Sequence, residues 1–431
     1  MVSAAEPTWV LHVDLDQFIA AVEILRHPEL EGRPVVVGGR GDPTERGVVS
    51  TASYAAREFG VGSGMPLRIA ARKCPDAVFL PVDKPAYDAA SVEVMDTLRS
   101  VEWGGVPVLV EVLGWDEAFV GPGPGHGELG DPHDVAERIR ADVLVATRLH
   151  CSVGIGDNKL RAKIATDFGK PRGVGRLTSD TWFEVMGERP TGALWGIGAK
   201  TARKLSALGI DTVAQLAASD ARALAAELGP TMGPWFHRLG RGVGDTTVDP
   251  TPYVARGHGR EETFQTDLTD PAAVEDAVRR LTGRVVEDID REGRLAVRVG
   301  LKVRLRPFVT FTRSLTLGAP TNDPALVAEA CRKFPGRIVV GIDAKRYLRA
   351  IDASRQDCTY MAADFEDLGT GLNHPITGVA TIPVSNTVWH HVAATYDSTT
   401  GVWVLYLDGV QDNTATVAAG TNTRIPRSDS I

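Results

Sequence analysis

Residues 106–121 read VPVLVEVLGWDEAFVG, two apolar runs typical of β-strands that meet near Gly114. Asp116 and Glu117 lie within the second run, and Asp14 ends a similar run, WVLHVDL, near the N-terminus. A carboxylate in an apolar strand is costly unless it is paired or bound to a cation. Because Mg²⁺ is held by carboxylates together with substrate phosphates, these three acids are candidate Mg²⁺ ligands.

The spacing of these acids leaves two interpretations open. Successive residues of a regular strand point to opposite faces, so Asp116 and Glu117 share a site only near a bend, which Gly114 permits. The alternative is a strand end whose acids form salt bridges and face solvent. Asp16 shares the face of Asp14 by the two-residue period of a strand, and it equally suits the N-cap of the helix that follows.

Outward from these runs, the chain changes character in stages. Strand-like and helix-like segments alternate over the first part of the chain, which indicates an α/β or α+β core. Residues 180–245 are rich in Ala and Leu with Gly turns, and they predict a small helical domain. A helical stretch flanked by β-type runs follows at residues 250–320. The Thr- and Val-rich tail after residue 360 predicts all-β structure.

The composition is that of an ordinary globular protein. The 431 residues suffice for about three domains, and 43% apolar with 24% charged residues exclude wholesale disorder. Since neither a membrane span nor a secretory signal is visible, we expect a cytoplasmic protein with no membrane partner. The net charge of −8 means that a nucleic-acid interface has to rest on local basic patches. The cysteines lack metal-type spacing and indicate free thiols in a reducing compartment: Cys74, Cys151, Cys331 and Cys358.

Four motifs occur in a fixed order along the chain: HVDLDQF, GVVSTASYAAREFGVGSGMP, EVLGWDEAF and SVGIGDNKLRAKIATDFGKPRG. Together they resemble the Y-family DNA polymerases of the DNA polymerase IV (DinB) type, over residues 8–325. The resemblance implies an α+β fold shaped like a right hand, with palm, small fingers, helical thumb and α/β little finger. A β-rich, incomplete tail follows. The implied domains are palm (1–24 and 83–179), fingers (25–82), thumb with a helix-hairpin-helix (180–245), little finger (250–345) and tail (360–431).

The same resemblance implies a template-directed, translesion DNA polymerase, a nucleotidyltransferase that adds a dNTP to a primer 3′-OH. Its partners are then primer–template DNA and dNTP, and we expect a monomer. The cofactor is a pair of Mg²⁺ ions, for which Mn²⁺ can substitute. Two alternatives stay open: a DNA-binding protein whose truncated little finger leaves it with impaired or no activity, and a secreted carbohydrate- or Ca²⁺-binding protein defined by the tail.

The resemblance assigns the metal site residue by residue. Asp14, Asp116 and Glu117 are implied to be catalytic and to hold the two ions, with the Leu15 carbonyl as a further ligand. Family members usually have Ser two residues before the paired acids, where this chain has Gly114 followed by a tryptophan. We therefore expect the packing behind the acids to differ from the usual arrangement.

The incoming nucleotide is implied to meet a second group of residues. Thr51, Tyr54 and Arg57 recur at spacings of three, so on a helix they share one face. By resemblance they contact the β- and γ-phosphates, with Lys163 as a further phosphate ligand. The alternative is an ordinary helix surface and a solvated lysine.

Ile19 occupies the position where the family normally has Tyr or Phe as a steric gate beneath the sugar. An aliphatic residue there resembles a minority branch of these polymerases. We expect weakened exclusion of ribonucleotides, because Ile is shorter and lacks a flat ring. The alternative is that Ile19 belongs to the core and another side chain closes the pocket.

Two segments are candidates for DNA contacts. LWGIGAKTARKLSALGI (194–210) resembles a helix-hairpin-helix, in which Gly196 and Gly198 let backbone N–H groups approach a phosphate near Lys200. Along a predicted little-finger strand, basic residues alternate with apolar ones, which either suits a duplex backbone or forms a solvated face. These basic residues are Lys302, Arg304 and Arg306.

The resemblance fails toward the C-terminus. FPGRIVVGIDAK (334–345) is similar to a short fragment of a histidine-biosynthesis isomerase, and WHHVAATYD and WVLYLDG resemble a laminin-G or concanavalin-like domain of which only part is present. The paired His390 and His391 are expected to be sheet residues rather than metal ligands. The ending RIPRSDSI contains no visible sliding-clamp peptide, which leaves recruitment by a clamp open. The chain therefore looks like a chimera of three sources.

Overall fold

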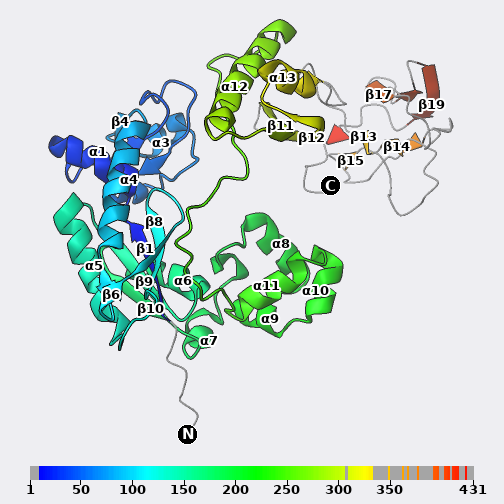
Figure 1. Ribbon diagram of the computed structural model, residues 1–431. Coiled ribbons are helices and arrows are strands. Elements are labelled where there is room, and N and C mark those ends of the chain that lie inside the picture. Colours follow the sequence, from blue (N-terminus) through cyan, green and yellow to red (C-terminus); the bar gives the residue numbers. More distant parts are fainter. Residues whose placement is uncertain are drawn as a thin grey trace. The chain divides into compact units, whose positions relative to one another are not determined.

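The computed structural model describes residues 9–305 and 309–332, followed by short strands between Leu348 and Arg424 (Figure 1). The chain divides into two compact units. One comprises Met1–Gly257 with Glu261–Thr266, and the other comprises His258–Arg260 with Asp267–Ile431. Several expectations from the sequence fall outside the described residues: those for Arg306, Cys358, His390, His391 and the isomerase-like segment 334–345.

The first unit is built on a five-stranded sheet in the order β10–β9–β1–β8–β7. All neighbouring strands are antiparallel except β9 and β10, which run parallel. The central strand, β1, is buried almost throughout: Leu11, Val13 and Leu15 line one face, and Val10, His12 and Asp14 line the other. The bounds are β1 Val10–Leu15, β7 Leu109–Val112, β8 Glu117–Gly121, β9 Cys151–Gly156 and β10 Val174–Leu177.

Helices cover both faces of this sheet. On one face, α4 (Lys84–Arg99) and α5 (Pro132–Thr147) pack over Leu11, Val13 and Leu15, whose side chains alternate with those of the opposite face. On the other, α6 (Lys159–Gly169) packs against the face that carries Val10. Each helix begins at a polar side-chain cap, which satisfies an otherwise unpaired N–H group: Asp83, Asp131 and Asn158.

A smaller sheet with its own core lies beside the large one in the first unit (Figure 1). Val36 and Leu67 are among the buried residues of that core. The strands are β2 Val35–Val37, β3 Thr51–Ala52 and β4 Val78–Leu80, in the order β3–β2–β4. The helices here are α1 Phe18–Arg26, η1 Pro28–Leu30, α2 Tyr54–Arg57 and α3 Leu67–Lys73, and β5 Glu102–Trp103 pairs with β6 Val106–Pro107.

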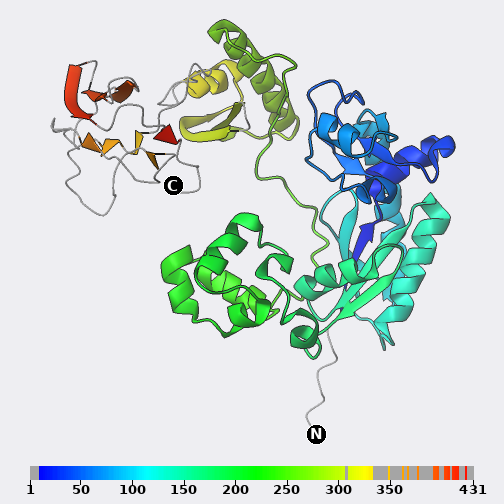
Figure 2. The same cartoon turned by 180° about the vertical axis from the view of Figure 1, so that it is seen from behind.

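The next part of the first unit is all helical, as its Ala- and Leu-rich composition predicts (Figure 2). Its core contains Trp182, Leu205 and Leu216, each fully buried. Thr212 and Gln215 form a reciprocal capping box at one helix start. The elements are α7 Trp182–Met186, η2 Thr191–Ala193, α8 Ala199–Ala207, α9 Val213–Ala218, α10 Ala221–Leu228 and α11 Met232–Gly240.

The second unit begins with two helices packed on a long antiparallel hairpin. Val286, Val299, Val327 and Cys331 form its small core. These elements are α12 Pro271–Arg291, β11 Ala296–Leu305, β12 Val309–Thr321 and α13 Pro324–Arg332. Short strands follow: β13 Leu348–Arg349, β14 Ala362–Ala363, β15 Glu366–Asp367, β16 Ile376–Thr377, β17 Val392–Asp397, β18 Val402–Leu407, β19 Val410–Thr416 and β20 Thr423–Arg424.

The strands β17, β18 and β19 form an antiparallel sheet, and they include much of the WHHVAATYD and WVLYLDG runs. The described part of the tail is therefore β-rich, as the sequence predicts. Among the helices of the described residues, none has the length and apolar character needed to cross a lipid bilayer.

Close approach of α6 to β9 and β10 depends on glycine. A Cβ on Gly154 would lie 2.0 Å from the carbonyl oxygen of Ala162, and one on Gly175 would lie 1.9 Å from that of Ala165. Since these obstacles are backbone atoms of a helix, a side chain there has no room unless the whole helix shifts. The position of α6 relative to the sheet is thus set by residues without side chains.

We predict that Gly154→Ala lowers the free energy of unfolding by at least about 2 kcal/mol, because the added methyl group overpacks a rigid contact. Urea denaturation followed by circular dichroism measures the loss. Gly62→Ala is the matched control, since nothing lies within 4 Å of a Cβ placed on Gly62. Equal stability of the two variants would contradict this account of how α6 packs.

Candidate active site

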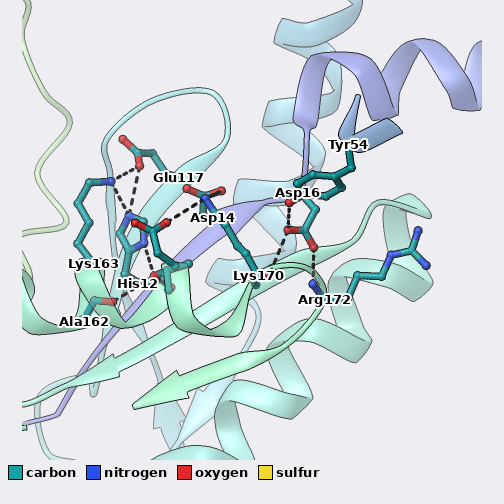
Figure 3. Close-up of polar contacts among 12 residues, drawn as sticks. His12, Asp14, Asp16, Tyr54, Glu117, Ala162, Lys163, Lys170 and Arg172 are labelled. Atoms are coloured by element: carbon teal, nitrogen blue, oxygen red, sulfur yellow. Dashed lines mark hydrogen bonds and ion pairs between the residues drawn. The ribbon is translucent and has the colours of Figure 1, made fainter. Parts of the chain in front are cut away.

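Three acids from two distant parts of the sequence lie at one end of the large sheet. Asp14 stands directly opposite Glu117 in the register of β1 and β8 (Figure 3). The backbone N–H of Leu15 donates to the carbonyl oxygen of Asp116 at 2.8 Å, which holds that residue beside the end of β1. The register of the sheet therefore brings the acids together.

Asp116 and Glu117 occupy the bend that the sequence analysis required. β8 begins only at Glu117, so Asp116 precedes the regular strand and does not follow its alternation. The backbone N–H groups of Leu113 and Gly114 donate to the carbonyl oxygen of Glu117 at 3.0 and 3.3 Å, which closes a tight connection between β7 and β8. Adjacent acids can thus belong to one site.

The environment of Asp14 and Asp116 disfavours an uncompensated negative charge. Burial raises the pKa of Asp14, while Lys170, whose Nζ lies 2.8 Å from Asp14 Oδ1, opposes that rise. Burial and the neighbouring Glu117 raise the pKa of Asp116. Within the part of the chain that the structure describes, no side chain is hydrogen-bonded or ion-paired to the Asp116 carboxylate. This end of the sheet therefore attracts positive charge.

The negative charge of Glu117 is compensated by Lys163 of α6 and by His12 of β1. Lys163 forms an ion pair with it, and His12 Nε2 lies 3.3 Å from its carboxylate. These two hydrogen-bonded partners outweigh burial and hold the pKa of Glu117 at about 2. Burial lowers the pKa of His12, whose Nδ1 lies 2.8 Å from the hydroxyl of Thr166. Glu117 is therefore a stable anion.

The donor set fits a hard divalent cation. Over the described ranges, no group of three His, Cys, Asp or Glu side chains already converges on a single point as a preformed metal site. Instead, the ammonium group of Lys170 lies against Asp14 and that of Lys163 against Glu117 (Figure 3). Each ammonium group occupies a place where a carboxylate can bind a cation. Carboxylate oxygens that hold an ammonium group in this way suit Mg²⁺ completed by water and phosphate oxygens.

The residues expected at the triphosphate do not share one helix, so the spacing argument was wrong for Thr51. Thr51 belongs to β3 and pairs with Val37, because the strand continues to residue 52 and Ser53 then caps α2. Tyr54 and Arg57 do lie on that short helix, with the guanidinium carbon 4.9 Å from the centre of the phenol ring. Two of the three residues are thus brought together on a helix.

Of the two sequence interpretations of Asp16, the helix N-cap was wrong. Asp16 caps no helix, since α1 begins at Phe18 after Gln17, whose φ is +47°. It is almost fully buried, with an exposed fraction of 4%. Its carboxylate accepts hydrogen bonds from Tyr54 and from two other residues distant in sequence. Its repeat spacing with Asp14 in HVDLDQF was the one available signal.

Lys170 is a site residue that the sequence did not reveal. Lys163, which the sequence predicts to contact phosphate, here pairs with Glu117 and lies 3.2 Å from His12 Nε2. Lys170 follows α6 and reaches Asp14 instead. A lysine in a loop has no periodic signature, so only its place in the KPRG end of the fourth motif could have indicated it.

Ile19 lies on α1 and packs, partly buried, against the main core of the large sheet. Trp115, which follows the glycine that replaces the usual Ser, packs against the same core. Its ring lies 6.2 Å from that of Tyr87, and Lys84 Nζ is 5.1 Å from the ring centre. The packing near the acids thus includes an aromatic side chain that bridges toward α4.

Gly196, Gly198 and Lys200 lie around the start of α8. Gly196 has φ +97°, which favours glycine, and a Cβ there would lie 2.6 Å from the ring of Trp235. Gly198 is the N-cap of α8, with no atom within 4 Å of a Cβ built on it, and Lys200 lies exposed in the first turn. The backbone N–H groups of this turn are open to an approaching anion.

Lys302 and Arg304 lie two residues apart on β11 and are both exposed. Arg304 donates to the hydroxyl of Thr310 across the hairpin at 3.0 Å. The expected alternation of basic and apolar residues is therefore present at these two positions.

The sequence matches known families along most of its length. Residues 13–167 match the impB/mucB/samB family, and residues 255–352 match the C-terminal domain of that family. Residues 192–244 match the thumb domain of DNA polymerase-iota. Residues 355–428 match the concanavalin A-like lectin/glucanases superfamily.

Curated relatives agree with these matches. DNA polymerase IV 2 of Mycobacterium tuberculosis (strain ATCC 25618 / H37Rv) is 49% identical over 329 residues, which cover 76% of this chain and 93% of the relative. DNA polymerase IV of Methanoculleus marisnigri is 40% identical over 324 residues, covering 74% and 87%. The chain belongs to the Y-family of DNA polymerases.

Solved structures of Y-family polymerases share the fold. A Y-family chimera superimposes with a TM-score of 0.65 at 24% identity, covering 75% of this chain and 93% of the other. DinB from Sulfolobus solfataricus gives a TM-score of 0.51 with the same identity and coverage. The predicted α+β right-hand polymerase fold is confirmed, and so are the resemblances to the Y-family polymerases and, in the tail, to a laminin-G or concanavalin-like domain.

The family settles the activity at a general level. This Y-family member is a template-directed DNA polymerase of the translesion type, a DNA-directed nucleotidyltransferase that depends on divalent metal. The alternative of a DNA-binding protein without polymerase activity is not favoured.

The lowered pKa of Glu117 predicts a pH dependence of stability. Its folded-state value lies below the unfolded one, so the stabilisation is present above the unfolded value and is lost as the pH falls toward about 2. From about pH 5 to about pH 3, the free energy of unfolding should drop by roughly 1 kcal/mol more in the unsubstituted chain than in Glu117→Gln. Chemical denaturation across this range measures the difference.

The control for this measurement is Glu128→Gln, at an exposed residue outside the helices and strands. Its pH slope should equal that of the unsubstituted chain. A Glu117→Gln variant with that same slope would show that His12 and Lys163 do not stabilise the carboxylate.

Proposed function

We propose that this polymerase binds its two divalent ions, Mg²⁺ or Mn²⁺, through Asp14, Asp116, Glu117 and the Leu15 carbonyl. The observation that carries the proposal is the meeting of three carboxylates at one sheet end, two of them against ammonium groups. Such ions, when bound, activate the primer 3′-OH and neutralise charge on the transferred phosphate. The protein's part is to fix the carboxylates through the sheet register, so that little reorganisation is needed.

We further propose that Tyr54 and Arg57 of α2, with Thr51 at the end of β3, contact the β- and γ-phosphates of the nucleotide. Arg57 supports this role because its Nε is anchored to the carbonyl oxygen of Ala52 at 2.9 Å, which leaves other N–H donors of the planar guanidinium for a ligand. These residues bind and orient the triphosphate; they do not react with it.

The two lysines are given separate roles. Lys163 is held between Glu117 and His12, so we propose it as the counter-ion that keeps Glu117 ionised. Lys170 lies at Asp14, on the side of the site where Asp16 and Tyr54 also lie (Figure 3). We propose Lys170, which is released from Asp14 when ions bind, as the phosphate-contacting lysine in place of Lys163.

For DNA, we propose contacts with the DNA backbone at Gly196, Gly198 and Lys200, at Lys302 and Arg304 of β11, and at Arg306. All of these are suited to phosphates, so they supply affinity without sequence specificity. We also propose the domain boundaries that the sequence predicts. We propose that the protein acts in the cytoplasm as a monomer, with or without recruitment by a sliding clamp.

We predict that Asp116→Ala abolishes primer extension in the presence of Mg²⁺ and leaves primer–template binding within about threefold, because the acid holds ions and not DNA. Gel-based extension and fluorescence anisotropy with a labelled duplex provide the two measurements. Asp142→Ala, on the exposed surface of α5, is the control and should extend normally. Extension by Asp116→Ala at the rate of the control would refute the metal assignment.

We also predict that Ile19→Phe raises the ratio of dNTP to rNTP incorporation efficiency by at least about tenfold, because the ring excludes a 2′-OH that isoleucine admits. Single-nucleotide kinetics with matched dNTP and rNTP measure the ratio. Ile24→Phe makes the same chemical change further along α1 and should leave the ratio unchanged. If the unsubstituted chain and Ile19→Phe reject ribonucleotides equally, Ile19 is not the gate.

A further inference from the structure

Asp16 is a buried carboxylate held by three donors that carry no positive charge. Tyr54 donates its hydroxyl proton to Oδ1 at 2.7 Å, and Ser152 donates to the same oxygen at 3.0 Å. The backbone N–H of Arg172 donates to Oδ2 at 2.9 Å. These donors lie 38, 136 and 156 residues away along the chain. One side chain therefore joins four separate segments of the first unit.

The same contacts argue against Asp16 as a further metal ligand. Its two oxygens already accept three hydrogen bonds, and the residue is 4% exposed. Among the described residues, it forms no ion pair with a lysine or arginine side chain, in contrast to Asp14 and Glu117. Its surroundings are those of a structural acceptor and not of an ion site.

Tyr54 is fixed at two points by consecutive residues of the chain. Its hydroxyl is bound by Asp16, and its backbone N–H donates to the side-chain oxygen of Gln17 at 2.5 Å. Burial and the bond to Asp16 raise the pKa of Tyr54, so the phenol keeps its proton. A phenol has one proton to donate, which means that the direction of the Tyr54 hydroxyl is set by Asp16 until a ligand competes for it.

Arg172 is the second element that Asp16 holds. Its φ of +58° lies in the left-handed region, which is costly for a residue with a side chain. Asp16 binds its N–H group, and the guanidinium of Arg140 donates to its carbonyl oxygen. Lys170, which pairs with Asp14, lies two residues earlier in this loop. Asp16 therefore contacts both Tyr54 and the loop of residues 170–172 that contains Lys170.

We propose that Asp16 is a positioning residue for nucleotide binding: it holds the Tyr54 side chain in place through its hydroxyl until an incoming phosphate competes for that proton, and it fixes the loop 170–172 that presents Lys170. It touches neither metal nor nucleotide and acts through these two elements. This inference rests on the proposed function, because it takes Tyr54 to contact the phosphates.

A double-mutant cycle with single-nucleotide kinetics tests the action through Tyr54. Asp16→Ala and Tyr54→Phe should each raise the KM for dNTP by about tenfold, the size expected for losing one hydrogen bond to a charged group. The double variant should show no more than the larger single effect, because both changes remove the same positioning. Should Asp16→Ala fold poorly, Asp16→Asn keeps the volume with one acceptor oxygen, and gives a smaller rise with the same lack of additivity.

Ser152→Ala is the matched control, since it removes a donor to the same Oδ1 atom and leaves Tyr54 intact. It should leave the KM within about twofold, which separates orientation of Tyr54 from general loss of packing. A rise in KM for Ser152→Ala equal to that for Asp16→Ala would overturn the proposal.

Hydrogen exchange supplies a readout that does not depend on activity. In the full chain without nucleotide, the backbone amide of Arg172 should exchange faster in Asp16→Ala and be unchanged in Tyr54→Phe. Unchanged exchange in Asp16→Ala would overturn the role of Asp16 in the loop. Additive effects on KM would overturn its action through Tyr54 alone. An unchanged KM in Tyr54→Phe would remove the nucleotide role of Tyr54 itself, and this inference with it.

Discussion

The structure depends on how negative charge is compensated at the end of β1 and β8. Asp14 and Glu117 face each other across two strands, and Asp116 adjoins them with no side-chain partner among the described residues. Burying several carboxylates is unfavourable unless cations or hydrogen-bond donors compensate their charge. Lys163 and Lys170 form ion pairs with two of the acids, and neutral donors bind Asp16. These interactions hold the elements that carry the donor groups against the end of the sheet.

The helix α6 has a central part in this arrangement. It packs against β9 and β10 at distances that only glycine allows, it carries Lys163, and it leads into the loop with Lys170. The positions of Lys163 and Lys170 therefore depend on the close packing of α6 on the large sheet. A shift of that helix would move both lysines at once.

Much of the fold could be predicted from local patterns. The apolar runs around Asp14 and Asp116 form the neighbouring strands β1 and β8, and their register is restricted because a shift by one residue would turn the buried side chains to the other face. The bend at Gly114 brings the two adjacent acids together. Thr51 was misplaced because a capping Ser53 ends a strand where simple spacing suggested a continuous helix. The partners of Asp16 and the position of Lys170 were out of reach, because they depend on contacts over long sequence distances and on loop conformation.

Two ammonium groups lie against the acids, that of Lys170 at Asp14 and that of Lys163 at Glu117. In small zinc domains the metal supplies the folding energy, and the apoprotein is unfolded. Here the chain supplies its own counter-charges to Asp14 and Glu117, so neither carboxylate depends on a metal ion for its compensation in the fold. As far as these two acids are concerned, folding of the sheet end does not require a supply of divalent metal.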